Sequence, residues 1–310
     1  MISPTDDFQQ IKATLPKLGI GLGLRRSLYT DTLQARQHID WLEIVPENHM
    51  GRGGKAYDMI AEARDHGFPI ISHGVALSIG STDALDEGYI RALQDLFKVA
   101  QPAWFSDHLT FSSYDNIHFQ DLIPMPFTYE AIDHVVAKIQ QLQARFDIPF
   151  LIENASYYCA FGQPELSEAQ FITEVLERAN CGLMLDINNV FVNATNHGYD
   201  PVAFLKQLPL DRVVQLHVAG HLERGNLIID THGEAIRDEV YDLLATALPM
   251  MDVHGILLER DQNFPPFDEL LGELRQLRQI DEAATTKTTT PLEVAQQRRC
   301  PLPSTNTKPP

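Results

Sequence analysis

Histidine, carboxylate and amide side chains recur in this chain directly behind short apolar runs. The run PFLIEN, for example, reaches Glu153 and Asn154 with no polar residue between Pro149 and Glu153. The residues found at the ends of such runs, or just after them, are Glu43, Glu47, Asn48, His73, Asp107, His108, Glu153, Asn154, Asp186, Asn188, Asn189, His217, His221, Asp230, His232, Glu259 and Asp261. Gathered in one buried place, these groups would need a cation to offset their desolvation, so the set predicts a metal site.

Each of these residues also has a purely structural interpretation. A single histidine can be a hydrogen-bonded core or rim residue, Asp186 can cap the next turn, and Glu43 and Asp107 can be ion-pair partners. Imidazole mixed with carboxylate and amide oxygen suits zinc, iron or manganese. The number of donors favours two or three ions, and Glu153 is a natural bridge between them. Donor type alone leaves a trizinc hydrolase and an iron oxidase both open.

The elements that must position these side chains follow from the apolar pattern. Eight short apolar runs read as buried parallel strands, at 18–24, 41–46, 69–74, 103–109, 149–154, 182–189, 213–220 and 255–260. Segments with helical spacing lie at 31–38, 56–67, 86–100, 128–146, 168–179, 200–207, 234–248 and 266–280. The alternation predicts a single (β/α)8 TIM barrel over residues 1–280. A doubly wound sheet is the alternative, but the glycine-rich stretch 19–27 lacks GxGxxG spacing.

A parallel barrel opens the carboxyl ends of all its strands on one face, where active sites lie. Residues as distant in sequence as His73 and Glu259 would therefore meet at one mouth. The tail 281–310 is rich in Thr and Pro and poor in apolar residues, so we expect it to be disordered.

Composition narrows the functional classes. The 310 residues carry a formal net charge of -18, which disfavours nucleic acid and anionic membranes as partners. The three cysteines form no CxxC pair, which fits a reducing compartment and argues against a thiolate zinc site. No secretion signal or membrane-spanning run is recognisable, and we expect a cytoplasmic protein.

Seven motifs together resemble the multinuclear non-heme iron-dependent oxidative enzymes, the family of the methanobactin biosynthesis oxidase. They are SHG at 72–74, SDH at 106–108, IEN at 152–154, LDINNVFVNATNHGYD at 185–200, LHVAGH at 216–221, IDTHGEAI at 229–236 and LLERD at 257–261, and the resemblance spans about residues 15–280. It implies a TIM barrel with two or three iron ions of mixed Fe2+/Fe3+ state. It also implies dioxygen as co-substrate and oxidation of cysteine residues in a ribosomally made precursor peptide, such as a Cys-rich copper-binding peptide. A separate leader-recognising partner protein is implied as well.

The resemblance also suggests how the ligands divide. His73, His108 and Glu153 match one iron site; Glu153 would bridge to a second with His217 and Glu259, joined by Asp186 or Asn189; Asp230 and His232 match a third. Glu47, Asn48, Asn154 and His221 would orient these ligands.

Three other functions remain open. A divalent-metal sugar isomerase would need a lysine near the metals, which no strand end supplies, and a phosphodiester hydrolase is disfavoured by the net charge. A non-catalytic metal- or peptide-binding scaffold would be expected to have lost a ligand.

Overall fold

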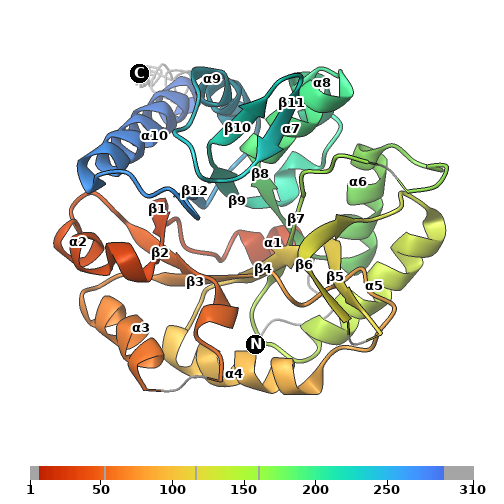
Figure 1. Ribbon diagram of the computed structural model, residues 1–310, viewed down its shortest axis with the longest axis horizontal. Helices are drawn as coiled ribbons and strands as arrows, with labels where there is room; N and C mark the ends of the chain where they lie inside the picture. The colour runs from red at the N-terminus through yellow and green to blue at the C-terminus, as the bar shows by residue number, and fades with distance from the viewer. Residues whose placement is uncertain (1–6, 52–53, 116, 160, 290–310) are drawn as a thin grey trace, which may run out of the picture.

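The computed structural model describes residues 7–51, 54–115, 117–159 and 161–289, and within them eight parallel strands close into a barrel (Figure 1). The strands are β1 (Gly19–Gly23), β2 (Trp41–Ile44), β3 (Ile70–Gly74), β4 (Phe105–His108), β7 (Phe150–Glu153), β8 (Gly182–Asp186), β9 (Val213–Val218) and β12 (Gly255–Leu258). They follow one another around the barrel in chain order, and β1 closes the ring on β12 through Gly19 and Gly255. The predicted TIM barrel and the positions of its eight strands are confirmed, except that the run predicted at 182–189 ends as a strand at Asp186 and continues as a helix.

Helices cover the outside of the barrel in the order expected from the sequence. They are α2 (Tyr29–Gln34), α3 (Lys55–Asp65), α4 (Glu87–Ala100), α5 (Tyr129–Gln143), α6 (Glu168–Ala179), α8 (Pro201–Leu205), α9 (Asp238–Ala247) and α10 (Phe267–Thr289). Short 3-10 turns lie at η1 (Arg26–Leu28), η2 (Pro46–Asn48), η3 (Leu210–Arg212) and η4 (Leu248–Met250). None of the helices in the described ranges is long and apolar enough to cross a membrane.

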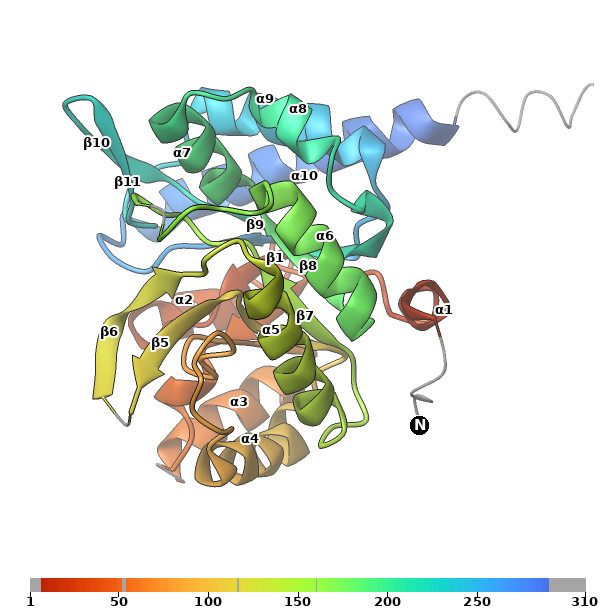
Figure 2. The same cartoon turned by 90° about the vertical axis from the view of Figure 1, so that its right-hand side faces the viewer.

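Two helices and two hairpins were not predicted. Helix α7 (Ile187–His197) starts directly at the end of β8, because the side chain of Asp186 caps it by accepting from the backbone N–H of Asn189 at 2.7 Å. Helix α1 (Phe8–Lys12) lies at the amino-terminal end of the barrel. The hairpins are β5 (Thr110–Tyr114) with β6 (Ile117–Pro124), and β10 (His221–Arg224) with β11 (Leu227–Asp230). Both follow the carboxyl ends of barrel strands and project from the same side of the molecule (Figure 2).

The interior of the barrel is a compact apolar layer beneath the carboxyl ends of the strands. Its residues are Phe8, Trp41, Ile71, Trp104, Leu151, Met184, Val214 and Leu257, packed as a cluster separate from the larger core between the sheet and the helices. A Cβ atom on Gly21 would lie 2.3 Å from the Trp41 ring, so only glycine leaves room for this indole. This apolar layer closes the barrel beneath the polar mouth and is called the apolar floor below.

The carboxyl-terminal boundary predicted from the sequence is wrong in part. Helix α10 continues past residue 280 to Thr289, so residues 281–289, expected to be disordered, are helical. The buried positions Leu270, Leu277 and Ala284 recur every seven residues, which keeps one face of the helix on the core. The rest of the predicted tail, 290–310, lies outside the described residues.

Candidate metal centre

The carboxyl ends of six barrel strands, with the loops behind two of them, bring histidines and carboxylates together at one mouth. Three overlapping groups present ligand atoms that lie within 4.8 Å of one another. They are His73, His108 and Glu153; Glu153, Asp186, His217 and Glu259; and His232, Glu259 and Asp261. Because Glu153 belongs to the first two groups and Glu259 to the last two, the groups form one continuous cluster.

In the first group, two imidazoles face the same carboxylate oxygen. The Nε2 atoms of His73 and His108 lie 3.0 and 2.9 Å from Oε2 of Glu153. His108 is held from behind, because its Nδ1 is 3.2 Å from the carbonyl oxygen of Gly74, which can only accept a hydrogen bond. The proton of neutral His108 therefore belongs on Nδ1, and Nε2 offers a lone pair to the site.

The second group is built around His217. Its Nδ1 lies 2.9 Å from Oε2 of Glu259 and 3.4 Å from Oε1 of Glu153. Asp186 divides its oxygens between two tasks: Oδ1 caps helix α7, and Oδ2 is buried and without a hydrogen-bond partner in the described part of the chain. The possible capping role of Asp186 and its place in the cluster are thus compatible.

The third group lies nearer the solvent and includes a residue missing from the predicted ligand set. His232 Nδ1 is 3.3 Å from both Glu259 Oε2 and Asp261 Oδ2, and its Nε2 is 2.7 Å from Asp230 Oδ1. Asp261 lies two residues beyond Glu259 in the LLERD motif, and this position just after the strand end is the feature of the sequence that indicates Asp261 as a ligand. Its other oxygen accepts from Arg25 at 2.5 Å.

Buried polar atoms without hydrogen-bond partners concentrate in this cluster. Within the described residues, Asp186 Oδ2, Asn189 Oδ1 and His221 Nε2 have no hydrogen-bond partner. Glu153 Oε2, His217 Nδ1, His232 Nε2 and Glu259 Oε2 also lack a well-formed hydrogen bond, although each lies 2.7–3.0 Å from an oppositely charged side chain of the cluster. Orphaned groups of this kind are rare in folded proteins. Most belong to side chains that meet within ligand distance of one another, so the residues present fit a bound transition-metal ion.

The charged side chains in the mouth shift one another's pKa values. Burial lowers the pKa of His108, but the Glu153 carboxylate more than offsets this and raises it to about 9. Burial raises the pKa of Glu153, yet His108 and His73 bring it well below its usual range. Burial raises the pKa of Asp186 well above its usual range, and Glu153 reinforces the shift against the opposing effect of His232. The mouth therefore favours cationic species beside Glu153, whether protons or metal ions.

The residues predicted to orient the ligands fall in different places. Asn154 exchanges two hydrogen bonds with the backbone of Asp186, at 2.9 and 3.1 Å, and so fixes the end of β8 beside β7. Glu47 accepts from the backbone N–H groups of Val75 and Ala76, just after His73.

Of the other two residues predicted to orient the ligands, His221 lies in the buried network and Asn48 lies on the exposed rim of the mouth. His221 Nδ1 lies 2.8 Å from Asn188 Oδ1, and the amide of Asn188 donates to Asp230. Asn48, in η2, is exposed and lies outside the buried cluster. Asn189 stays a candidate ligand, because its amide nitrogen is used on the Asn154 carbonyl while its Oδ1 is free of hydrogen bonds within the described residues.

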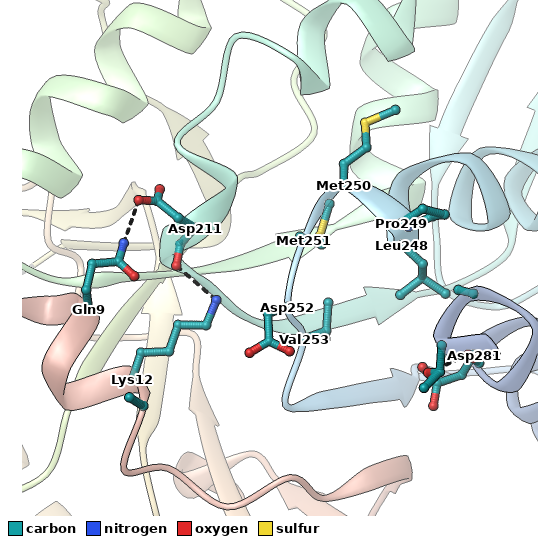
Figure 3. Close-up of a pocket in the computed structure, with 13 residues that line it drawn as sticks. Gln9, Lys12, Asp211, Leu248, Pro249, Met250, Met251, Asp252, Val253 and Asp281 are labelled. Carbon is teal, nitrogen blue, oxygen red and sulfur yellow. Dashed lines mark hydrogen bonds between the residues drawn. The ribbon is translucent and has the colours of Figure 1, made fainter. Parts of the chain in front are cut away.

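A separate cavity of about 770 Å³ opens at the opposite, amino-terminal end of the barrel, between α1, η4 and α10 (Figure 3). Its described lining holds Lys12, whose pKa burial lowers to about 8 and whose Nζ donates to the carbonyl of Asp211 at 2.9 Å. No histidine or cysteine is among the described lining residues, which sets this cavity apart from the mouth.

Fold and site together define a TIM-barrel protein with a candidate polynuclear metal centre at the carboxyl ends of its strands. The chain belongs to the family of RiPP precursor modification enzymes MbnB/TglH/ChrH, whose model matches residues 19–282. It is 41% identical over 267 residues to a UPF0276 protein of Anaeromyxobacter sp. (strain Fw109-5), covering 86% of this chain and 94% of that one. A UPF0276 protein of Shewanella amazonensis is also 41% identical, covering 85% of this chain and 95% of the relative.

Solved structures confirm the fold. An L-ribulose 3-epimerase superposes with a TM-score of 0.56 at 12% identity, covering 93% of this chain and all of the other. A 3-keto-D-glucoside 4-epimerase from E. coli superposes with a TM-score of 0.52 at 13% identity, covering 85% and 99% of the two chains. At such identities the similarity describes the barrel alone.

Proposed function

We propose that this enzyme uses two or three bound iron ions and dioxygen to oxidise cysteine residues of a ribosomally synthesised precursor peptide. The observation that carries the proposal is the buried Glu153 carboxylate, which lies against His73 and His108 on one side and His217 on the other. Membership of a family of RiPP precursor modification enzymes supports a precursor peptide as the substrate.

The donor set favours iron. Two imidazoles and one carboxylate, as in His73, His108 and Glu153, are the donors of non-heme iron(II) oxygenases. When bound, ferrous iron would supply open coordination positions for a thiolate and for dioxygen, together with the one-electron chemistry that dioxygen requires. We propose His73, His108, Glu153, Asp186, His217, Asp230, His232, Glu259 and Asp261 as the residues that hold the ions, with Asn189 as an alternative to Asp186.

The chain itself contributes orientation and exclusion of water. Gly74 holds the ring of His108, and the Asp186 backbone is held by Asn154. The apolar layer around Trp41 and Trp104 closes the barrel below the cluster, so the mouth opens only away from that floor. A cysteine side chain must therefore enter from the carboxyl-terminal face.

The rim of this face supports a peptide substrate and a leader-recognising partner protein. The β5–β6 hairpin exposes Tyr114, Ile117 and Phe119, and the β10–β11 hairpin exposes Leu222 and Leu227. Exposed apolar side chains on projecting elements mark protein-binding surfaces. We propose that the partner binds across the hairpins and presents the peptide to the mouth.

The first test is the metal content of protein purified without oxygen, by elemental mass spectrometry, with Mössbauer spectroscopy on an iron-enriched sample. We expect two or three irons per chain with magnetic coupling through a bridging ligand. Stoichiometric zinc that iron cannot replace would contradict the proposal and favour an isomerase or hydrolase.

The second test is turnover. Iron-loaded enzyme, a Cys-containing precursor peptide encoded beside the gene and any small partner protein encoded there are mixed under air. We expect dioxygen consumption together with a change in peptide mass that maps to a cysteine. For variants of the mouth in this assay, the matched control is His254→Gln. It also replaces a buried histidine, but one at the amino-terminal end of the barrel, where His254 hydrogen-bonds the Pro16 carbonyl.

A further inference from the structure

A second buried carboxylate lies beneath the candidate metal centre. Glu43, on β2, is 2% exposed and belongs to none of the three ligand groups. Its two oxygens both lie 3.1 Å from Nε2 of His217, on the side of the ring opposite to Nδ1. Oε2 also accepts from Nε2 of Gln215 at 2.6 Å. His217 is thus held between Glu43 below and the Glu153 and Glu259 carboxylates above.

The polarity of these hydrogen bonds is set by Trp104. An indole N–H can only donate, and Trp104 Nε1 lies 2.7 Å from Gln215 Oε1. The oxygen of the Gln215 amide must therefore face Trp104, and its NH2 group must face Glu43. Since both Trp104 and Gln215 are fully buried, water does not compete for these positions.

Two proton positions remain for a neutral His217. Gln215 Nε2 also lies 2.9 Å from His217 Nε2, so a ring protonated on Nδ1 would accept a hydrogen bond from Gln215. A cation at Nδ1 removes this arrangement, because Nδ1 must then offer its lone pair. The ring proton is then on Nε2, and Glu43 is the acceptor within reach.

We propose that Glu43 is a positioning residue: it accepts the Nε2 proton of His217 and so leaves Nδ1 free to bind the metal ion. This inference rests on the proposed metal centre and adds a residue to it. Carboxylates that hold the second nitrogen of a ligating histidine fix its tautomer and raise its basicity. The directed row Trp104–Gln215–Glu43–His217 extends that support from the apolar floor to the ligand.

The substitution Glu43→Gln tests the inference with little change of volume. The NH2 group of Gln215 still needs an acceptor, so the new amide must turn its oxygen to Gln215 and its NH2 to His217. Two donors would then meet at Nε2 unless His217 moves its proton to Nδ1. The variant therefore favours the tautomer that cannot bind a cation through Nδ1.

Binding of Zn2+ to metal-free protein, measured by competition with a chromophoric chelator, gives the readout. We expect Glu43→Gln to weaken one class of zinc sites by about 10- to 100-fold, with a native circular dichroism spectrum. Trp104→Phe removes only the donor that orients Gln215, so this variant should lose less zinc affinity than Glu43→Gln does. The control Glu168→Gln changes a partly buried carboxylate on α6 that belongs to none of the ligand groups, and this variant should bind zinc as the unaltered protein does.

A measurement on the unaltered protein covers the case in which Glu43→Gln does not fold. In the zinc-loaded enzyme, long-range 1H–15N spectra should show His217 with a protonated Nε2 and a metal-bound Nδ1. An unprotonated or metal-bound Nε2 would overturn the inference, as would a folded Glu43→Gln variant with unchanged zinc affinity. An unaltered protein that binds neither zinc nor iron would instead overturn the proposed function, and the inference with it.

Discussion

The Nε2 atom of His108 lies 2.9 Å from Oε2 of Glu153, although strands β4 and β7 are separated in the chain by a hairpin and a helix. Adjacent pairing in the barrel places the two residues side by side, with His108 in register with Glu153. Because Glu153 also lies near His73 and His217, its carboxylate is the point at which the first two ligand groups meet.

Replacing this shared carboxylate should affect more than one metal ion. We expect Glu153→Gln to lower the iron content by at least one equivalent and to abolish the magnetic coupling between the remaining ions, because the amide cannot bridge as a carboxylate does. Elemental analysis and Mössbauer spectroscopy measure both effects. Full metal content in Glu153→Gln, with His254→Gln as the control, would show that the ions bind elsewhere.

Two substitutions at Asp186 separate its capping role from its role as a ligand. Asn is as good an N-cap as Asp, so Asp186→Asn should lower metal content while preserving helix α7. Asp186→Ala also loses the cap and should lower the free energy of unfolding by about 1 kcal/mol more than Asn does. Urea unfolding of the two metal-free variants makes the comparison. Equal stabilities would contradict the capping role.

Asp261 should matter for the outermost ion only. It lies within 3.3 Å of His232 but is not part of the groups that contain Glu153. We expect Asp261→Asn to lose at most one metal ion and to keep the ion held by His73, His108 and Glu153. Titration with ferrous iron under anaerobic conditions counts the sites. Loss of all metal would mean that the three groups do not bind independently.

A pH dependence of stability should arise at Glu168, which belongs to none of the ligand groups. Burial raises the pKa of this carboxyl to about 7, against the opposing hydrogen bond from Tyr157. The unfolded chain releases the proton near pH 4.3, so between these values the folded state holds more protons and the free energy of unfolding falls as pH rises. Between pH 5 and 8 the unaltered protein should lose about 2–3 kcal/mol relative to Glu168→Gln.

Chemical unfolding of the two metal-free proteins at several pH values measures this difference. Glu177→Gln is the matched control, because Glu177 is an exposed carboxylate on the same helix α6. A constant difference between the unaltered protein and Glu168→Gln across the range would show that Glu168 titrates normally.

Local pattern predicted the barrel well because parallel strands covered on both faces must be short and apolar. The helix α7 escaped prediction because LDINNVFVNATNHG begins a helix without any turn after the strand, with Asp186 serving as both the strand end and the cap. The extension of α10 was missed because a Thr-rich sequence can still bury Ala284 when one face of a helix is already packed.

The sequence by itself determined that carboxylates and histidines stand at or near strand ends, because apolar runs lead directly to Glu153 and Asp186 and His217 lies near the end of another. Only the tertiary structure decided which of them face a common point. That choice depends on the register between neighbouring strands and on the direction of each side chain across the closed barrel, which no local pattern encodes. These geometric terms set Asn48 on the exposed rim, bring Asp261 to His232, and place Glu43 beneath His217.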